Sequence, residues 1–261
     1  MKAALFALFA LLACGGCSKK EAPPRRTEPW LANPSASGNA QVSASAAPQS
    51  FHFAPDSSIS FSVPGKKAKI SGRVAISEGA LRLDTRDLKN ASASIEVDLT
   101  KLSLDPETIP EGIELGGAPD ALALQWLELG AEVAAERRRE LQVARFELSS
   151  VETVSPPFLD FGVRSKGQVR ASLVGTLLIH GFRAPVRCDV VLKPLESAPG
   201  APKRLSIRSA SALVVALAPH DISARSPSGI ADALAMARAS EWIGKNARVE
   251  FELQAVADAD K

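Results

Sequence analysis

The chain has 261 residues, of which 46% are hydrophobic and 5% aromatic, and its formal net charge is only +2. This length and composition predict one or two domains with a buried core. So small a net charge is atypical of proteins that bind nucleic acid through a clustered basic face, and we expect no nucleic acid partner. The short basic run at residues 137–139 is flanked by Glu136 and Glu140, which is typical of a solvated helix face.

The N-terminal residues have the pattern of a bacterial export signal. Met1 and Lys2 form a short basic start, and residues 3–13 are an unbroken apolar run. A run of this length is too short to cross a bilayer, which needs about 20 residues, but it fits the apolar region of a secretory signal. The run ends in Cys14, and Leu-Leu-Ala-Cys resembles a lipobox.

Cys14 is therefore the expected lipidation site, with residues 1–17 forming the signal peptide and lipobox. Cys17 is the alternative because Gly15 and Gly16 precede it, and an ordinary cleaved signal with incidental cysteines is a third interpretation. Several acyl chains on one cysteine would anchor the protein firmly to a membrane. No aspartate follows either cysteine, so we expect an exported, lipid-anchored envelope protein, held at the outer membrane and facing the periplasm.

Residues 18–50 are rich in Ala, Ser and Pro and contain little apolar material apart from Trp30 and Leu31. Such a composition cannot bury enough surface to fold by itself. We expect a disordered tether, with a reach of about 30 Å, between the lipid and a folded domain.

Residues 51–261 are expected to form that domain, because apolar and polar residues alternate there from near its start. Period two is typical of half-buried antiparallel strands. Glu78 and Gly79 are expected to form a turn within this region. The alternating segments are 58–63, 70–76, 81–83, 95–99, 169–179, 186–192, 249–255 and one long strand over 205–217.

Two segments interrupt the alternation. In residues 119–143, Leu122, Trp126, Leu129 and Val133 fall at helical spacing. Residues 226–245 begin with Ser-Pro and are rich in alanine, which also indicates a helix. Helices inserted between strands suit the lid or plug of a barrel, and the helix that carries Trp126 is expected to cover one mouth.

The sequence contains no recognisable catalytic or metal-binding motif. His52, His180 and His220 are far apart and lack metal-ligand spacing. His180 is expected in a turn, and the pair His220 and Asp221 could mimic part of a triad, but no Gly-x-Ser-x-Gly motif accompanies it. Cys188 is expected to be a buried apolar side chain. We therefore expect no enzyme, no metal and no cofactor.

Several stretches resemble the YceI-like family. Residues 51–63, FHFAPDSSISFSV, resemble its opening strand, and residues 173–186, LVGTLLIHGFRAPV, resemble its Gly-x-Leu-x-Ile-x-Gly hairpin. Weaker similarity lies in residues 144–151, 218–222 and 248–255, so that the resemblance covers about residues 51–257.

This resemblance implies an all-β, eight-stranded, antiparallel, lipocalin-like barrel with one or two inserted helices. Family members are typically exported, and some hold a polyisoprenoid or another amphiphile in an elongated apolar interior. Two departures concern the ligand more than the fold. Residues 124–127 and a longer helix replace a His-Leu-x-Ser-x-Asp-Phe-Phe motif, and residues 219–221, Pro-His-Asp, replace an Asn-Arg pair.

The apolar parity of each strand is expected to face the barrel interior, because charged residues occupy the opposite parity. Small residues on the inward parity favour a hollow interior that carries an isoprenoid or other lipid-like molecule. The alternative is a structural or interaction lipoprotein whose barrel is filled by its own side chains. The expected lumen residues are Gly72, Ile95, Val97, Trp126, Phe146, Ala171, Leu173, Gly175, Leu177, Cys188, Val190, Ser209, Ser211, Leu213 and Phe251.

Overall fold

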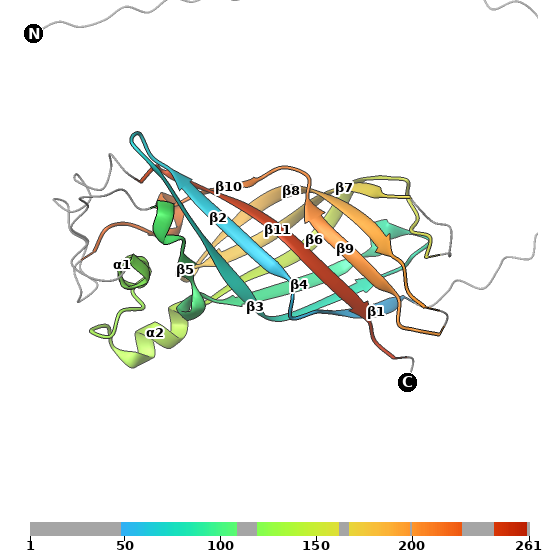
Figure 1. The fold of residues 1–261 in the computed structure, drawn as a ribbon, viewed down its shortest axis with the longest axis horizontal. Helices are drawn as coiled ribbons and strands as arrows, with labels where there is room; N and C mark the ends of the chain where they lie inside the picture. The colour runs from blue at the N-terminus through green and yellow to red at the C-terminus, as the bar shows by residue number, and fades with distance from the viewer. Residues whose placement is uncertain (1–47, 109–118, 162–166, 199, 226–242, 260–261) are drawn as a thin grey trace, which may run out of the picture. The chain divides into compact units, whose positions relative to one another are not determined.

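A computed structural model describes residues 48–108, 119–161, 167–198, 200–225 and 243–259 (Figure 1). These residues belong to one compact unit. The expected signal, both candidate lipidation sites and almost all of the expected tether lie outside the described residues, as does nearly all of the helix expected over 226–245.

The described residues are mostly strands. The strands are β1 (Gln49–Phe53), β2 (Ser58–Pro64), β3 (Lys69–Leu83), β4 (Ser92–Asp98), β5 (Ser103–Leu104), β6 (Val143–Ser155), β7 (Val169–Ile179), β8 (Phe182–Leu195), β9 (Arg204–Ser209), β10 (Leu213–Ala216) and β11 (Asn246–Ala257). The α-helices are α1 (Pro119–Trp126) and α2 (Ala135–Leu141). Strand β1 begins two residues before the expected start of the domain at Phe51.

Eight strands close into an antiparallel barrel. The order β11-β2-β3-β4-β6-β7-β8-β9 is hydrogen-bonded throughout, and β9 returns to β11. The three other strands pair with members of this ring: β1 pairs with β3 and β11, β5 pairs with β3, and β10 pairs with β11. The predicted eight-stranded lipocalin-like barrel is therefore confirmed.

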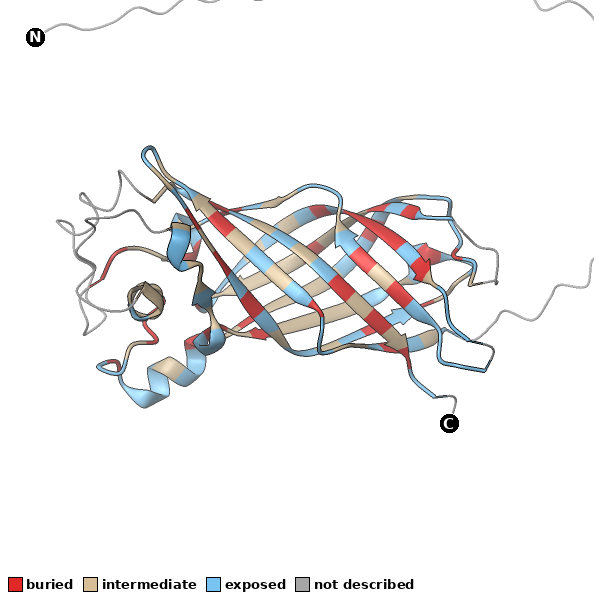
Figure 2. Ribbon diagram, viewed as in Figure 1, coloured by how far each residue is buried: buried red, intermediate tan, exposed pale blue. Residues whose placement is uncertain are grey.

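Alternation along the strands separates the inside of the barrel from the outside. Buried and exposed bands alternate along the strands in Figure 2. Arg170, Arg208 and Glu252 are exposed, whereas their neighbours Ala171, Ile207 and Leu253 are buried. The inward parity is the apolar one, as expected from the sequence.

The expected helix over 119–143 is broken in the structure. Helix α1 ends at Trp126, Glu128 has a left-handed backbone with φ of 54°, and α2 begins only at Ala135. Leu127 and Leu129 are both buried. Residues two positions apart face different sides of a helix, so a turn is needed to bury both.

Two expectations about strand boundaries were wrong. Glu78 and Gly79 do not form a turn but lie within the long β3, where a bulge between Ile76 and Glu78 keeps later apolar residues on the inside. Phe53 covers Gly79, and its ring atom would be 2.5 Å from a Cβ at that position.

The long strand expected over 205–217 is split into β9 and β10. The break comes directly after Ser209, whose Oγ accepts a hydrogen bond of 3.2 Å from the main-chain N–H of Phe251 on β11. A side-chain oxygen thus takes the place of a main-chain partner where the ladder is interrupted. Beyond the break, β10 pairs with β11.

Candidate functional site

The barrel encloses an apolar cavity of about 380 Å³. Its described wall consists of aliphatic and aromatic residues with two exceptions, Arg145 and the buried Cys188. The side chain of Arg145 forms ion pairs with Glu96 and Glu147, which share its outward parity. The cavity therefore offers apolar contacts along its length, and no charged pair lies on its inward parity.

Side chains do not fill the middle of the barrel. Ile59, Ile95, Leu173 and Phe251 belong to the cavity wall and point inward, yet each keeps an intermediate accessible surface. Since the outside of the barrel is on the opposite parity, this accessible surface faces the cavity. The interior is hollow at this level.

The two ends of the barrel differ. Toward the end where β1 joins β3 and β11, Phe51, Leu83, Leu205 and Leu253 are no more than 2% exposed and form a packed core. At the other end lie α1 and α2 (Figure 1). Residues of α1 and the turn after it, Leu122, Ala123, Trp126 and Leu127, line the cavity there. Trp126 thus lies at one end of the cavity, and its role as a cover of that mouth stays a prediction.

Most of the expected lumen residues lie on the cavity wall. They are Ile95, Val97, Trp126, Phe146, Ala171, Leu173, Leu177, Cys188, Val190, Leu213 and Phe251. The structure brings these residues together from β4, α1, β6, β7, β8, β10 and β11. Their role in binding a ligand stays a prediction.

The two glycines among the expected lumen residues do not open the lumen. A Cβ at Gly175 would lie 2.4 Å from the ring of Phe146 and 2.5 Å from the carbonyl oxygen of Glu147. A Cβ at Gly72 would similarly lie 2.5 Å from the carbonyl oxygen of Ser103 and 2.6 Å from the ring of Phe61. An aromatic ring packs directly against each glycine, and the ring, rather than the glycine, faces the cavity.

The two serines also lie elsewhere. The Oγ of Ser209 accepts a hydrogen bond from the N–H of Phe251 at the break between β9 and β10. Ser211 is exposed and lines a different, smaller hollow on the outside of the barrel. Neither serine is part of the cavity wall.

Sequence reasoning missed two kinds of wall residue. Ile59, Phe61, Ile207, Val249 and Leu253 share the inward parity of their strands, so the same alternation could have selected them. Leu99 belongs to the alternating segment 95–99 in the same way. The second kind lies between β4 and α1, outside the alternating segments, and consists of Leu102 and Leu104.

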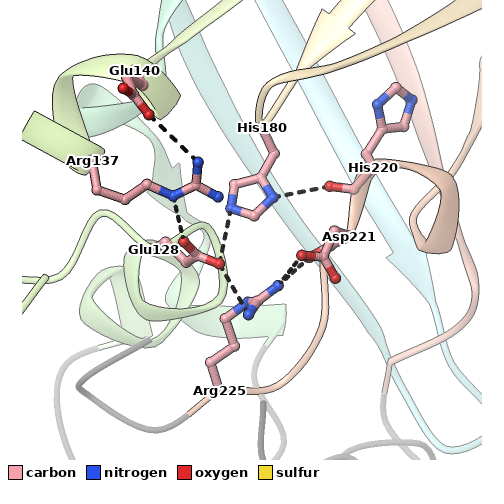
Figure 3. Close-up of polar contacts among 7 residues, drawn as sticks. All are labelled: Glu128, Arg137, Glu140, His180, His220, Asp221 and Arg225. Carbon is pink, nitrogen blue, oxygen red and sulfur yellow. Dashed lines mark hydrogen bonds and ion pairs between the residues drawn. The ribbon is translucent and has the colours of Figure 1, made fainter. Parts of the chain in front are cut away.

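A partly buried charged cluster lies at the end of the barrel near α1 and α2 (Figure 3). Glu128 accepts from Arg137 Nε at 3.0 Å and pairs with Arg225 Nη1 at 2.9 Å, while Arg225 Nη2 lies 2.6 Å from Asp221 Oδ2. His180 Nδ1 donates to the carbonyl oxygen of His220 at 3.0 Å. This cluster joins the turn after α1, the β7–β8 hairpin and the segment after β10.

Within this cluster, His180 is fully buried and has a left-handed backbone with φ of 52°. Burial lowers the pKa of His180 below its usual value, against the raising effects of the His220 carbonyl and of Glu128, whose Oε1 lies 3.8 Å from Nε2. The imidazole is therefore neutral at neutral pH, and its role is to hold the hairpin turn in place.

The geometry does not assemble the triad fragment considered for His220 and Asp221. The Asp221 carboxylate binds Arg225 and does not orient His220, whose Nδ1 has no hydrogen-bond partner among the residues that the structure describes. Burial raises the pKa of the Cys188 thiol to about 11, so this side chain is a neutral, buried thiol at neutral pH. Within the described ranges, His, Cys, Asp and Glu form no group that could hold a metal.

Among the residues that the structure describes, no helix is long and apolar enough to cross a membrane.

These features define a class: a closed, antiparallel β-barrel with an apolar cavity. The structure resembles that of a polyisoprenoid-binding domain from Saccharophagus degradans, with a TM-score of 0.50 and 16% identity over 81% of this chain and 99% of that one. The YceI-like resemblance read from the sequence is thus confirmed at the level of the fold.

Two further solved structures are similar at lower scores. BcnA of Burkholderia cenocepacia has a TM-score of 0.47 with 13% identity, covering 76% of this chain and 96% of that one. The YceI protein of Campylobacter jejuni has a TM-score of 0.42 with 9% identity, covering 69% and 80%. No family model matches the sequence, and no curated protein matches it.

Proposed function

We propose that this protein is a carrier or binding protein for a long apolar molecule, a polyisoprenoid or a similar lipid, and not an enzyme. The observation that carries the proposal is the apolar cavity of about 380 Å³ inside the barrel. Its size falls within the range of small-molecule sites, about 300–1,000 Å³. The fold is shared with a domain that is described as polyisoprenoid-binding, which supports the same ligand class.

A ligand that fills this space would gain dispersion contacts with the apolar wall of the cavity.

We further propose that the carrier is an exported lipoprotein, lipidated on Cys14 and held in the cell envelope, at the outer membrane facing the periplasm. The support is the basic start, the short apolar run and the Leu-Leu-Ala-Cys pattern. A labelled fatty acid should enter the wild-type protein and C17S but not C14S. Labelling lost only in C17S would move the anchor to Cys17, and labelling of neither cysteine would refute the anchor.

The cargo can be identified by extraction. The full chain with C14S and C17S is purified from a bacterial envelope fraction, its lipids are extracted with organic solvent, and the extract is analysed by mass spectrometry. We expect one class of long apolar molecule in stoichiometric amount. Protein that folds normally but yields only traces of mixed membrane lipid would refute the carrier and favour a structural role.

A further inference from the structure

The wall of the barrel has an open seam between β8 and β10, formed by residues 185–189 on one side and 211–214 on the other. Strand β8 pairs with β9 only from Val190 to Leu195. The last main-chain bond between these two sides runs from the N–H of Ala210 to the carbonyl oxygen of Asp189, at 2.7 Å. Beyond it, no pairing joins β10 to β8 within the described residues.

The sequence of β8 fits an edge without a neighbour beyond Asp189. In an antiparallel strand, the N–H and C=O of one residue point to the same side, and successive residues alternate. Because the carbonyl oxygen of Asp189 accepts from Ala210, Arg187 and Pro185 face the seam. Proline has no N–H to donate and is confined to edges of sheets, so Pro185 cannot donate to a ladder that has already ended at Asp189.

The seam is hollowed and adjoins the cavity. A space of about 360 Å³ is lined by residues 185–189 and 211–214. Two of these residues, Cys188 and Leu213, also belong to the wall of the central cavity. The two spaces therefore lie on either side of the same two residues. No strand pairing among the described residues joins these two residues to each other.

The chemistry of the seam differs from that of the cavity. Ser211 is exposed, the main-chain N–H and C=O of Arg187 face the seam, and the neighbouring Val214 is 57% exposed. The seam thus offers hydrogen-bonding groups beside apolar surface. Apart from the weakly hydrogen-bonding thiol of Cys188, the described strand residues of the cavity wall offer none on their inward parity. The packed core lies toward one end of the cavity and α1 at the other.

An amphiphile held in this barrel must place its polar end where hydrogen bonds are available, because burying a polar group without a partner is unfavourable. We propose that the seam is a second binding element, which holds the polar end of the cargo while its apolar chain occupies the cavity. The ligand class is a single long apolar chain that ends in a hydrogen-bonding group such as a hydroxyl or a carboxylate. This inference rests on the proposed function of the cavity.

Two rod-shaped fluorescent probes test the seam because they differ only in a polar end: diphenylhexatriene and its propionic acid derivative. The protein is the full chain with C14S and C17S, freed of lipid. A212W places a large ring in the seam, and A216W, at the exposed far end of β10, is the matched control.

We expect A212W to weaken binding of the acid by about tenfold, the loss expected for one hydrogen bond to a charged group. Binding of diphenylhexatriene should stay unchanged, and A216W should alter neither probe. Equal effects of A212W on both probes, or no effect on either, would overturn the inference.

A second measurement avoids the risk that the A212W protein does not fold. S211C places a thiol there, and its alkylation rate is followed by peptide mass spectrometry. The acid should slow alkylation at this position, whereas diphenylhexatriene should not. Equal protection by both probes, or by neither, would show that the polar end lies elsewhere.

The outcomes separate the two proposals. If the wild-type protein binds neither probe, the proposed function itself fails. If diphenylhexatriene binds but the seam variants behave like the control, the cavity carries the cargo and only the seam inference fails.

Discussion

Substitution of Ala93 by leucine would show whether the cavity is a binding space or an artefact of loose packing. Ala93 lies on the inward parity of β4, lines the cavity and keeps an intermediate accessible surface. Leucine adds about three CH2 equivalents, which at about 0.8 kcal/mol each stabilise the lipid-free protein by about 2.4 kcal/mol. For a domain of this size the melting temperature should rise by about 5–10 °C.

The same substitution should reduce the lipid content, because it occupies space that the cargo needs. The assay compares the thermal unfolding of lipid-free A93L with that of lipid-free wild type, and quantifies lipid in each protein as purified. S94L is the matched control, since Ser94 lies on the outward parity of the same strand. A lower melting temperature with unchanged lipid content would mean that the barrel is already packed, because overfilling a core costs about 1–3 kcal/mol.

Three further changes have expected outcomes. Gly175→Ala should lower stability by about 1–3 kcal/mol, since its Cβ would approach the Glu147 carbonyl to 2.5 Å, and chemical denaturation checks this. Folding lowers the pKa of His180, so the stability that this residue contributes is complete above the unfolded pKa of about 6.5 and is lost as the pH falls through the folded pKa. Asparagine tolerates the left-handed backbone, so H180N should make the free energy of unfolding depend less on pH in that range. An unchanged pH dependence in H180N would assign it to other groups. Deletion of residues 18–46 should leave the melting temperature unaltered, and a clear decrease would mean that this segment packs on the barrel.

The barrel could be predicted because alternation is a local signal. Each strand carries its own pattern of apolar and charged residues, so the inward parity of β7, β8 and β11 follows from the sequence alone. Alternation does not reveal how deep in the cavity a residue lies. For that reason Gly72 and Gly175 were expected in the lumen, although the rings of Phe61 and Phe146 cover them.

Breaks in the elements were harder to predict because they depend on distant partners. Ser209 and Ser211 continue the alternation of one strand, and only the hydrogen bond from Phe251 shows that the ladder ends there. The helix over 119–143 was likewise consistent with the spacing of Trp126, Leu129 and Val133. Its break depends on burying Leu127 as well, against Val74, Val97 and Leu99 of the barrel end.

The partly buried charged cluster could not be predicted from the sequence because its members come from segments far apart in the chain. Glu128, His180 and Asp221 all have left-handed backbones, with φ of 54°, 52° and 53°. Such conformations in residues other than glycine cost about 1–3 kcal/mol each and persist only where the surroundings hold them. Here the surroundings are the ion pairs to Arg137 and Arg225 and the hydrogen bond to the His220 carbonyl.

The α1 end and the seam therefore differ in what holds them closed. At the α1 end, Glu128 pairs with both Arg137 and Arg225. Arg225, which is only 7% exposed, also pairs with Asp221. At the seam, no strand pairing joins Cys188 to Leu213 within the described residues. Fewer polar contacts of the described residues therefore hold the seam than hold the α1 end.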